Sequence, residues 1–183
     1  MRDALGRLAR AFTTREALFL GFCATFVVLT RALLRMHLSV PGHSAFFLAF
    51  FLLLGRACVP RAGAASFVGG VAGVIVALFG MGRSGPLLLF KLLLPGLVVD
   101  AGAALAPRFA MRTATCALLG ALAGLPRGLL LAPVEWLLGV DTELIVWQTL
   151  LGSIAAMLFG AAGGALVPSV YRRLAANDLL PGR

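Results

Sequence analysis

The sequence predicts an all-α membrane protein in which six helices cross the bilayer. Of the 183 residues, 61% are hydrophobic and 13% are charged, and the mean hydropathy is +1.01. Soluble domains are about 45–50% apolar and about 25% charged, so a soluble domain of this length could not bury so much apolar surface. The apolar segments show no alternating pattern and are too long for strands of a membrane barrel. The same composition excludes disordered, disulfide-stabilised and coiled-coil proteins.

A basic lead, residues 1–16, precedes the first apolar segment, residues 17–34. A basic head before an apolar run is typical of a signal peptide, but no small-x-small cleavage site follows this run and basic residues flank it instead. We therefore expect a retained first span. The second span, residues 41–55, is short and rich in Phe, and it begins at a Pro-Gly turn with Ser44 as a helix cap.

Four further spans and a tail complete the predicted membrane domain, residues 17–167. The third span is rich in Gly and Ala, and Pro95-Gly96 interrupts the fourth. In order, these spans are residues 62–80, 86–106, 113–132 and 144–167, and the polar tail is residues 168–183. The short connections leave no room for a separate soluble domain.

The basic residues predict how the chain is oriented. The chain has 16 basic and 7 acidic residues, and this excess predicts loop orientation in a membrane, not nucleic-acid binding. With six spans, one side holds eleven arginines: Arg2, Arg7, Arg10, Arg15, Arg56, Arg61, Arg108, Arg112, Arg172, Arg173 and Arg183. The other side holds four: Arg31, Arg35, Arg83 and Arg127. Because cytoplasmic loops are enriched in Lys and Arg, we expect a multi-pass protein of the cell (inner) membrane with both termini in the cytoplasm.

Three ionisable residues within the spans are candidate functional groups, because charges in hydrocarbon cost about 2.5–3.5 kcal/mol each on insertion scales. Lys91 and Asp100 flank Pro95-Gly96 on roughly opposite faces of the fourth span, and Arg127 lies in the fifth. A proline break is tolerated against protein or a water-lined cavity, so this span is predicted to border a polar cavity. In the alternative, Lys91 extends to the headgroups, Asp100 does so or pairs with Arg108, and Arg127 marks a helix end.

The outer connection between the first two spans, residues 35–44, contains both histidines, His37 and His43. Such a loop is suited to act as a lid with hydrogen-bonding groups. Metal binding is the weaker alternative, because no Cys or carboxylate accompanies the two imidazoles. Nucleophile-elbow, zinc-protease and Walker sequences are absent, so we expect no enzyme, and nothing indicates a haem, flavin or iron–sulfur cofactor.

Small residues recur at four-residue spacing, which lets helix backbones approach closely in lipid. These stripes are Ala17/Gly21/Thr25, Gly69/Gly73, Gly120/Gly124 and Gly160/Gly164. They predict either packing within the chain or docking to another membrane subunit. The stripe of the first span is the best candidate for docking.

The pattern resembles the S components of energy-coupling factor transporters, which are the substrate-binding subunits of vitamin importers. The resemblance covers about 170 residues and includes Pro41-Gly-His-Ser44 before a Phe-rich span, Leu54-Gly-Arg56, the Gly/Ala-rich third span, and Lys91-Leu-Leu-Leu-Pro-Gly-Leu-Val-Val-Asp100. It implies a T-type membrane subunit and two cytoplasmic ATPases as partners, with the S component toppling in the membrane to carry its solute inward. It also implies docking to the T subunit through Ala17, Gly21 and Thr25, although the usual Ala-x-x-x-Ala is not strictly kept.

The resemblance places substrate binding near the outer face, under the first loop and against spans four to six. By position, this implies His43, Lys91, Arg127, Glu135 and Trp136 as contacts, and Asp100 joins them as an intramembrane charge. The identity of the small solute does not carry over, although a basic pocket favours an acidic or polar aromatic one. We expect a closed pocket of about 300–1,000 Å³. A structural or assembly subunit without a ligand would lack it. A small channel or ion-coupled carrier using Asp100 is the third and least favoured alternative.

Overall fold

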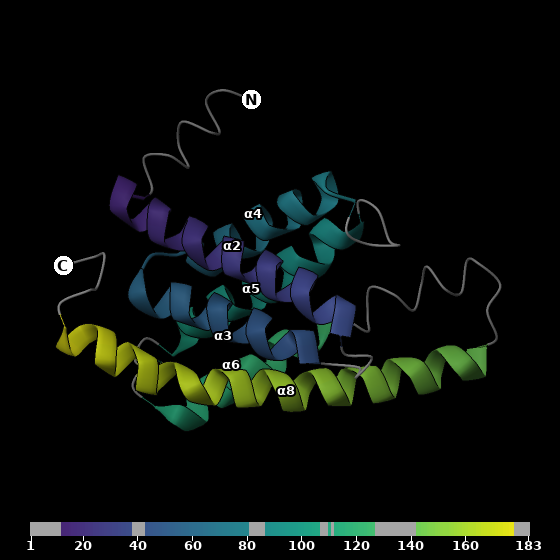
Figure 1. Ribbon diagram of the computed structural model, residues 1–183. Helices are drawn as coiled ribbons and strands as arrows, with labels where there is room; N and C mark the ends of the chain where they lie inside the picture. The colour runs from purple at the N-terminus through teal and green to yellow at the C-terminus, as the bar shows by residue number, and fades with distance from the viewer. Residues whose placement is uncertain are drawn as a thin grey trace.

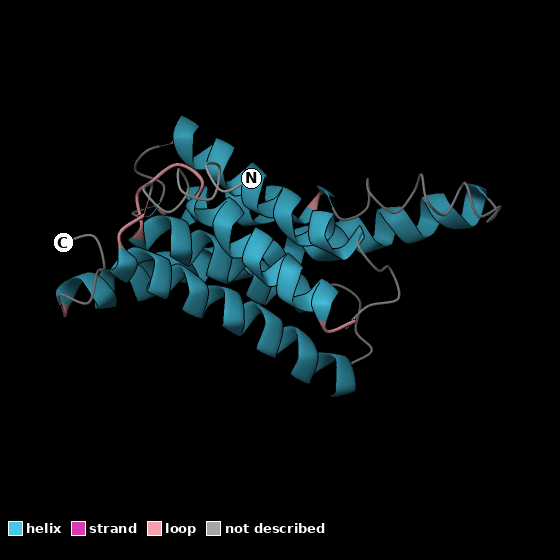
Figure 2. Ribbon diagram, turned by 90° about the horizontal axis from the view of Figure 1, so that it is seen from above, coloured by secondary structure: helices cyan, strands magenta, loops and turns pink. Residues whose placement is uncertain are grey.

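The computed structural model describes residues 12–37, 43–80, 87–106, 110, 112–126 and 142–177. These residues form six helices and no strand, which confirms the all-α prediction (Figures 1 and 2). The helices are α2 (Thr14–His37), α3 (His43–Cys58), α4 (Ala64–Leu78), α5 (Leu87–Leu105), α6 (Thr113–Gly124) and α8 (Thr142–Ala176). Each predicted span overlaps one of them.

The last helix is longer than its predicted span. α8 has 35 residues and continues through Pro168, which is fully buried, to Ala176. Pro168 has no N–H to donate to the carbonyl of Gly164 one turn earlier, yet the helix does not end there. The N-terminal turns of α8 extend beyond the ends of the other helices (Figures 1 and 2).

Two of the described helices are long and apolar enough to cross a membrane. They are α2, over Thr14–Leu33, and α8, over Val146–Ala176. The apolar parts of α3, α4 and α6 are shorter, at 10–17 residues. Length and composition therefore give limited support for membrane association through α2 and α8.

The helices pack as an up-and-down bundle. α8 lies against α6 and α3, α4 lies against α5, and α2 lies against α3 and α4. The purple start of α2 and the yellow end of α8 lie at the same end of the bundle (Figure 1). We call this the Asp100 end, where α2 and α4 begin and α3 and α5 finish. The cavity end is the opposite end, where α2 finishes and α3 begins.

Glycines set the distance between α6 and α8. A methyl group added to Gly120 or to Gly160 would overlap the other's carbonyl oxygen, and one added to Gly164 would overlap the carbonyl of Cys116. On the other side of the bundle, Gly69 and Gly73 face the backbone of α5 in the same way. Three of the four predicted small-residue stripes therefore serve packing within the chain.

The start of α2 is held by a capping box. Thr13 N–H donates to Glu16 Oε2 at 2.7 Å, and Glu16 N–H donates to Thr13 Oγ1 at 3.3 Å. This reciprocal pair satisfies two amides that helix geometry leaves without partners. Glu16 is also paired with Arg61 Nε at 3.1 Å, which ties the beginning of α2 to the connection between α3 and α4.

Candidate functional site

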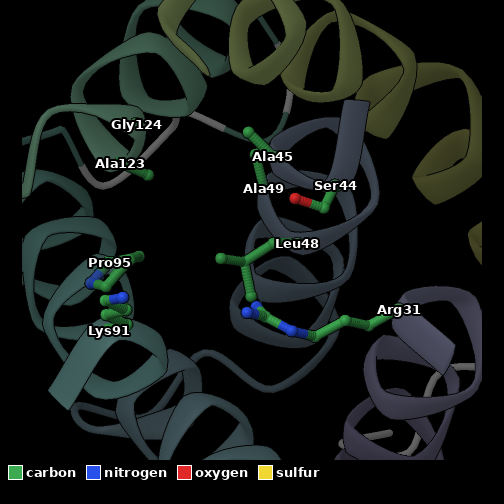
Figure 3. A pocket seen from close by; sticks show the side chains of 9 residues that line it. All are labelled: Arg31, Ser44, Ala45, Leu48, Ala49, Lys91, Pro95, Ala123 and Gly124. Atoms are coloured by element: carbon green, nitrogen blue, oxygen red, sulfur yellow. The ribbon is translucent and has the colours of Figure 1, made fainter. Parts of the chain in front are cut away.

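A cavity of about 80 Å³ lies among four helices at the cavity end. Among the described residues, its lining has two cations, one hydroxyl and six small or apolar residues: Arg31, Lys91, Ser44, Ala45, Leu48, Ala49, Pro95, Ala123 and Gly124. Arg31 extends from α2 past Leu48, the Ser44 hydroxyl turns toward the hollow from α3, and Lys91 lies opposite on α5 (Figure 3). The cavity is therefore basic on two sides.

Local sequence explains why α5 borders this cavity. Pro95 lies one turn after Lys91 and has no N–H to donate to the Lys91 carbonyl, so α5 continues but lacks one backbone hydrogen bond where both residues line the hollow. Opposite α5, the small residues Ala45 and Ala49 lie one turn apart on α3 and leave the space open. The end of α6 contributes Ala123 and Gly124, which are also small.

The volume corrects one expectation. A pocket of about 300–1,000 Å³ was predicted, because small-molecule sites have that size, whereas the described lining encloses about 80 Å³. One water needs about 10–15 Å³ by a comparable measure. The hollow therefore has room for a ligand group of a few atoms.

Asp100 does not lie on the described lining of this cavity. Its carboxylate lies at the Asp100 end, where Oδ2 accepts hydrogen bonds from Ser66 Oγ at 2.6 Å and Ser66 N–H at 2.8 Å. Oδ1 accepts one from Ala65 N–H at 3.3 Å and lies 3.2 Å from Arg56 Nε. Asp100 is expected to bind solute beside Lys91, but its described contacts join α5 to the start of α4 and to Arg56.

Asp100 caps α4 from a neighbouring helix. The residue before α4 is Gly63, which has no side chain to satisfy the first amides of the helix. A Cβ on Gly96 would meet Ala65 O at 2.7 Å and Ser66 Cα at 2.9 Å, so α5 approaches α4 closely at this point. Asp100 is one turn after Gly96 on the same face of α5. Its carboxylate therefore reaches the amides that Gly63 leaves open.

Arg56 completes this cluster and was not among the predicted site residues. It lies in the last turn of α3, and its side chain is 11% exposed, against 12% for Asp100. Its Nη1 donates to Val59 O at 3.4 Å. Pairing of Asp100 with Arg108 is one alternative from the sequence, and Arg108 lies outside the described residues; the observed partner, Arg56, lies 44 residues before Asp100.

The other predicted contacts are only partly described. Lys91 lines the cavity. Arg127, Glu135 and Trp136 lie outside the described residues, as does the side chain of His43, which is the first residue of α3. Arg31 and Ser44 line the cavity without having been predicted as contacts. The sequence pattern instead predicts an orienting charge at Arg31 and a helix cap at Ser44.

The α2 stripe, Ala17, Gly21 and Thr25, differs from the other small-residue stripes. No described atom lies within 4 Å of a Cβ placed on Gly21, and Thr25 is exposed, with its hydroxyl donating to Gly21 O at 2.9 Å. Leu18 and Phe22 beside it are 71% and 61% exposed. This face of α2 is therefore not covered by the described part of the bundle.

Comparisons with protein-family models, with curated proteins and with solved structures give no match to this chain.

Proposed function

We propose that the chain is the membrane-embedded, substrate-binding subunit of an ATP-driven importer of the energy-coupling factor type. In this proposal all six helices cross the bilayer, and a small polar solute enters the cavity from outside. The main support is the cavity itself, because Lys91 and Arg31 line a polar hollow within the bundle instead of extending away from it. Intramembrane ionisable groups at a cavity are a usual mark of a substrate site.

The charge distribution supports the orientation. The described arginines at the Asp100 end are Arg15, Arg56, Arg61, Arg112, Arg172 and Arg173. Three described basic residues, Arg31, Arg35 and Lys91, lie toward the cavity end. Because Lys and Arg are enriched on the cytoplasmic side, this distribution favours the Asp100 end as cytoplasmic and the cavity end as external.

A structural or assembly subunit without a ligand is the second candidate. The observation that favours it is the Asp100–Arg56 cluster, since mutually paired charges are what such a subunit would contain. The observation that favours the importer instead is the cavity, because Arg31 and Lys91 both line it.

Loss of a retained solute on changing Lys91→Ala tests the importer proposal. The protein is purified gently and its native mass measured, and we expect a bound small molecule that the variant has lost, because the ammonium group lines the cavity. The exposed Arg173→Ala serves as a control that removes a cation elsewhere. Wild-type protein without any bound molecule would favour the scaffold, and equal retention by the variant would exclude Lys91 from the site.

A bulky residue in the α2 stripe tests partner docking. Gly21→Leu is expected to abolish co-purification of the T-type subunit and the two ATPases while leaving the thermal midpoint within about 2 °C, because no described atom lies near its Cβ. Gly152→Leu on α8 is a matched control, since its Cβ position also has no described atom within 4 Å. Partners that remain bound to the Gly21 variant would show that this stripe is not the docking surface.

A further inference from the structure

We propose that the cavity binds an oxyanion group, a carboxylate or a phosphate, between Arg31 and Lys91 with the Ser44 hydroxyl as a third contact. This inference rests on the proposed function and specifies its substrate class. It derives from the arrangement of the three side chains around one hollow.

Three different helices supply the polar groups. Arg31 comes from the last turns of α2, Ser44 from the first turn of α3 and Lys91 from the first half of α5. In Figure 3 the Arg31 guanidinium and the Lys91 side chain approach the hollow from opposite sides, and the Ser44 hydroxyl turns toward it. A ligand in this hollow would therefore meet donors from several directions.

The charges select an anion. The described lining carries two positive side chains, Arg31 and Lys91, which attract an anionic ligand more strongly than a cationic one. Hydrogen bonds between charged partners are about twice as strong as neutral ones, and the guanidinium fork matches the geometry of carboxylate and phosphate. The beginning of α3 adds a partial positive charge. The C-terminal end of α6 adds a partial negative charge of similar size. The full positive charges of Arg31 and Lys91 are larger than this partial charge.

The cavity size restricts the group further. About 80 Å³ corresponds to roughly five to eight water positions. A carboxylate or a tetrahedral phosphate fits such a space with few atoms attached. The remaining described lining is small or apolar, as in Ala45, Leu48 and Ala49. These residues limit the size of the bound group and add few polar contacts.

Ligand-dependent unfolding tests the inference. The protein in a neutral detergent is heated in sodium phosphate, in sodium acetate, and in sodium chloride at matched ionic strength. An anion at ten times its Kd raises the thermal midpoint by about 3–6 °C relative to chloride. The variants Arg31→Gln and Lys91→Gln should each lose this rise, and Arg31→Lys should retain part of it because the charge stays.

Controls separate binding from general salt effects. Phosphate stabilises many proteins by exclusion from their surface, so an equal rise in Arg31→Gln and Lys91→Gln would overturn the inference. The exposed Arg112→Gln should respond as the wild type does. If Arg31→Gln fails to fold, Lys91→Gln still decides. No rise in either phosphate or acetate would also overturn it.

The source of the anion is resolved by native mass spectrometry. A bound lipid that disappears in Lys91→Gln would assign the group to a phospholipid headgroup, which supports the anion site but counts against the importer. Anion stabilisation without retained lipid supports a free solute. If the wild-type protein shows the anion effect but neither imports a solute nor binds ATPase partners, the proposed function alone is refuted. If it imports a neutral solute and shows no anion effect, this inference alone is refuted.

Discussion

Asp100→Ala is expected to lower the free energy of unfolding by about 3–5 kcal/mol, because removing one partner of a buried ion pair leaves the other charge buried. Asp100 and Arg56 are both nearly buried, and the carboxylate also accepts from the first amides of α4. The change would therefore leave Arg56 without its carboxylate partner and α4 without a cap. The bundle should loosen at the Asp100 end while the cavity remains.

Thermal unfolding in detergent measures this loss, with three comparisons. Ser66→Ala removes one hydrogen bond of the cluster and should cost about 1 kcal/mol. The double variant Arg56→Met, Asp100→Leu should recover much of the loss, because it removes both charges together. The exposed Glu143→Gln should be neutral. A stable Asp100→Ala protein that has lost its solute would show that Asp100 is a binding residue after all.

The second large effect concerns the contact between α6 and α8. Gly160→Ala is expected to cost about 3 kcal/mol, since the new methyl group would overlap the carbonyl of Gly120 and two helix backbones would have to separate. Gly152→Ala makes the same chemical change on the same helix where no described atom lies within 4 Å. It should be neutral or stabilise by up to about 1 kcal/mol, because Ala favours the helix.

Opposite effects of one substitution on one helix make the comparison decisive. In thermal unfolding, Gly160→Ala should lower the midpoint by about 6–12 °C while Gly152→Ala leaves it unchanged or higher. Equal midpoints for the two variants would mean that α6 and α8 do not pack as closely as Gly120 and Gly164 indicate.

Most of the helical architecture could be predicted from the sequence, because apolar runs and their breaks depend on local composition. Each of the six predicted spans overlaps a described helix. The end of α8 could not be predicted in this way. The predicted sixth span ends at residue 167, whereas the bundle accommodates Pro168 as a buried residue inside the helix.

The candidate site was less predictable, since it depends on which helices are neighbours. Lys91 could be identified because a charge in an apolar run is conspicuous. Arg31 could not, because arginines at a span end usually orient the chain. Asp100 was conspicuous too, but its role depends on Gly96, which lets α5 approach the first amides of α4. Spacing along one helix contains no information about that approach.

The unequal helix lengths have a consequence for the lipid in the proposed arrangement. α4 has 15 residues, or about 22 Å, against a hydrocarbon core of about 30 Å. α8, with 35 residues, measures about 52 Å. Such hydrophobic mismatch is relieved by thinning the bilayer beside short helices and tilting long ones. A membrane thinned around α4 would shorten the path that a bound solute has to travel.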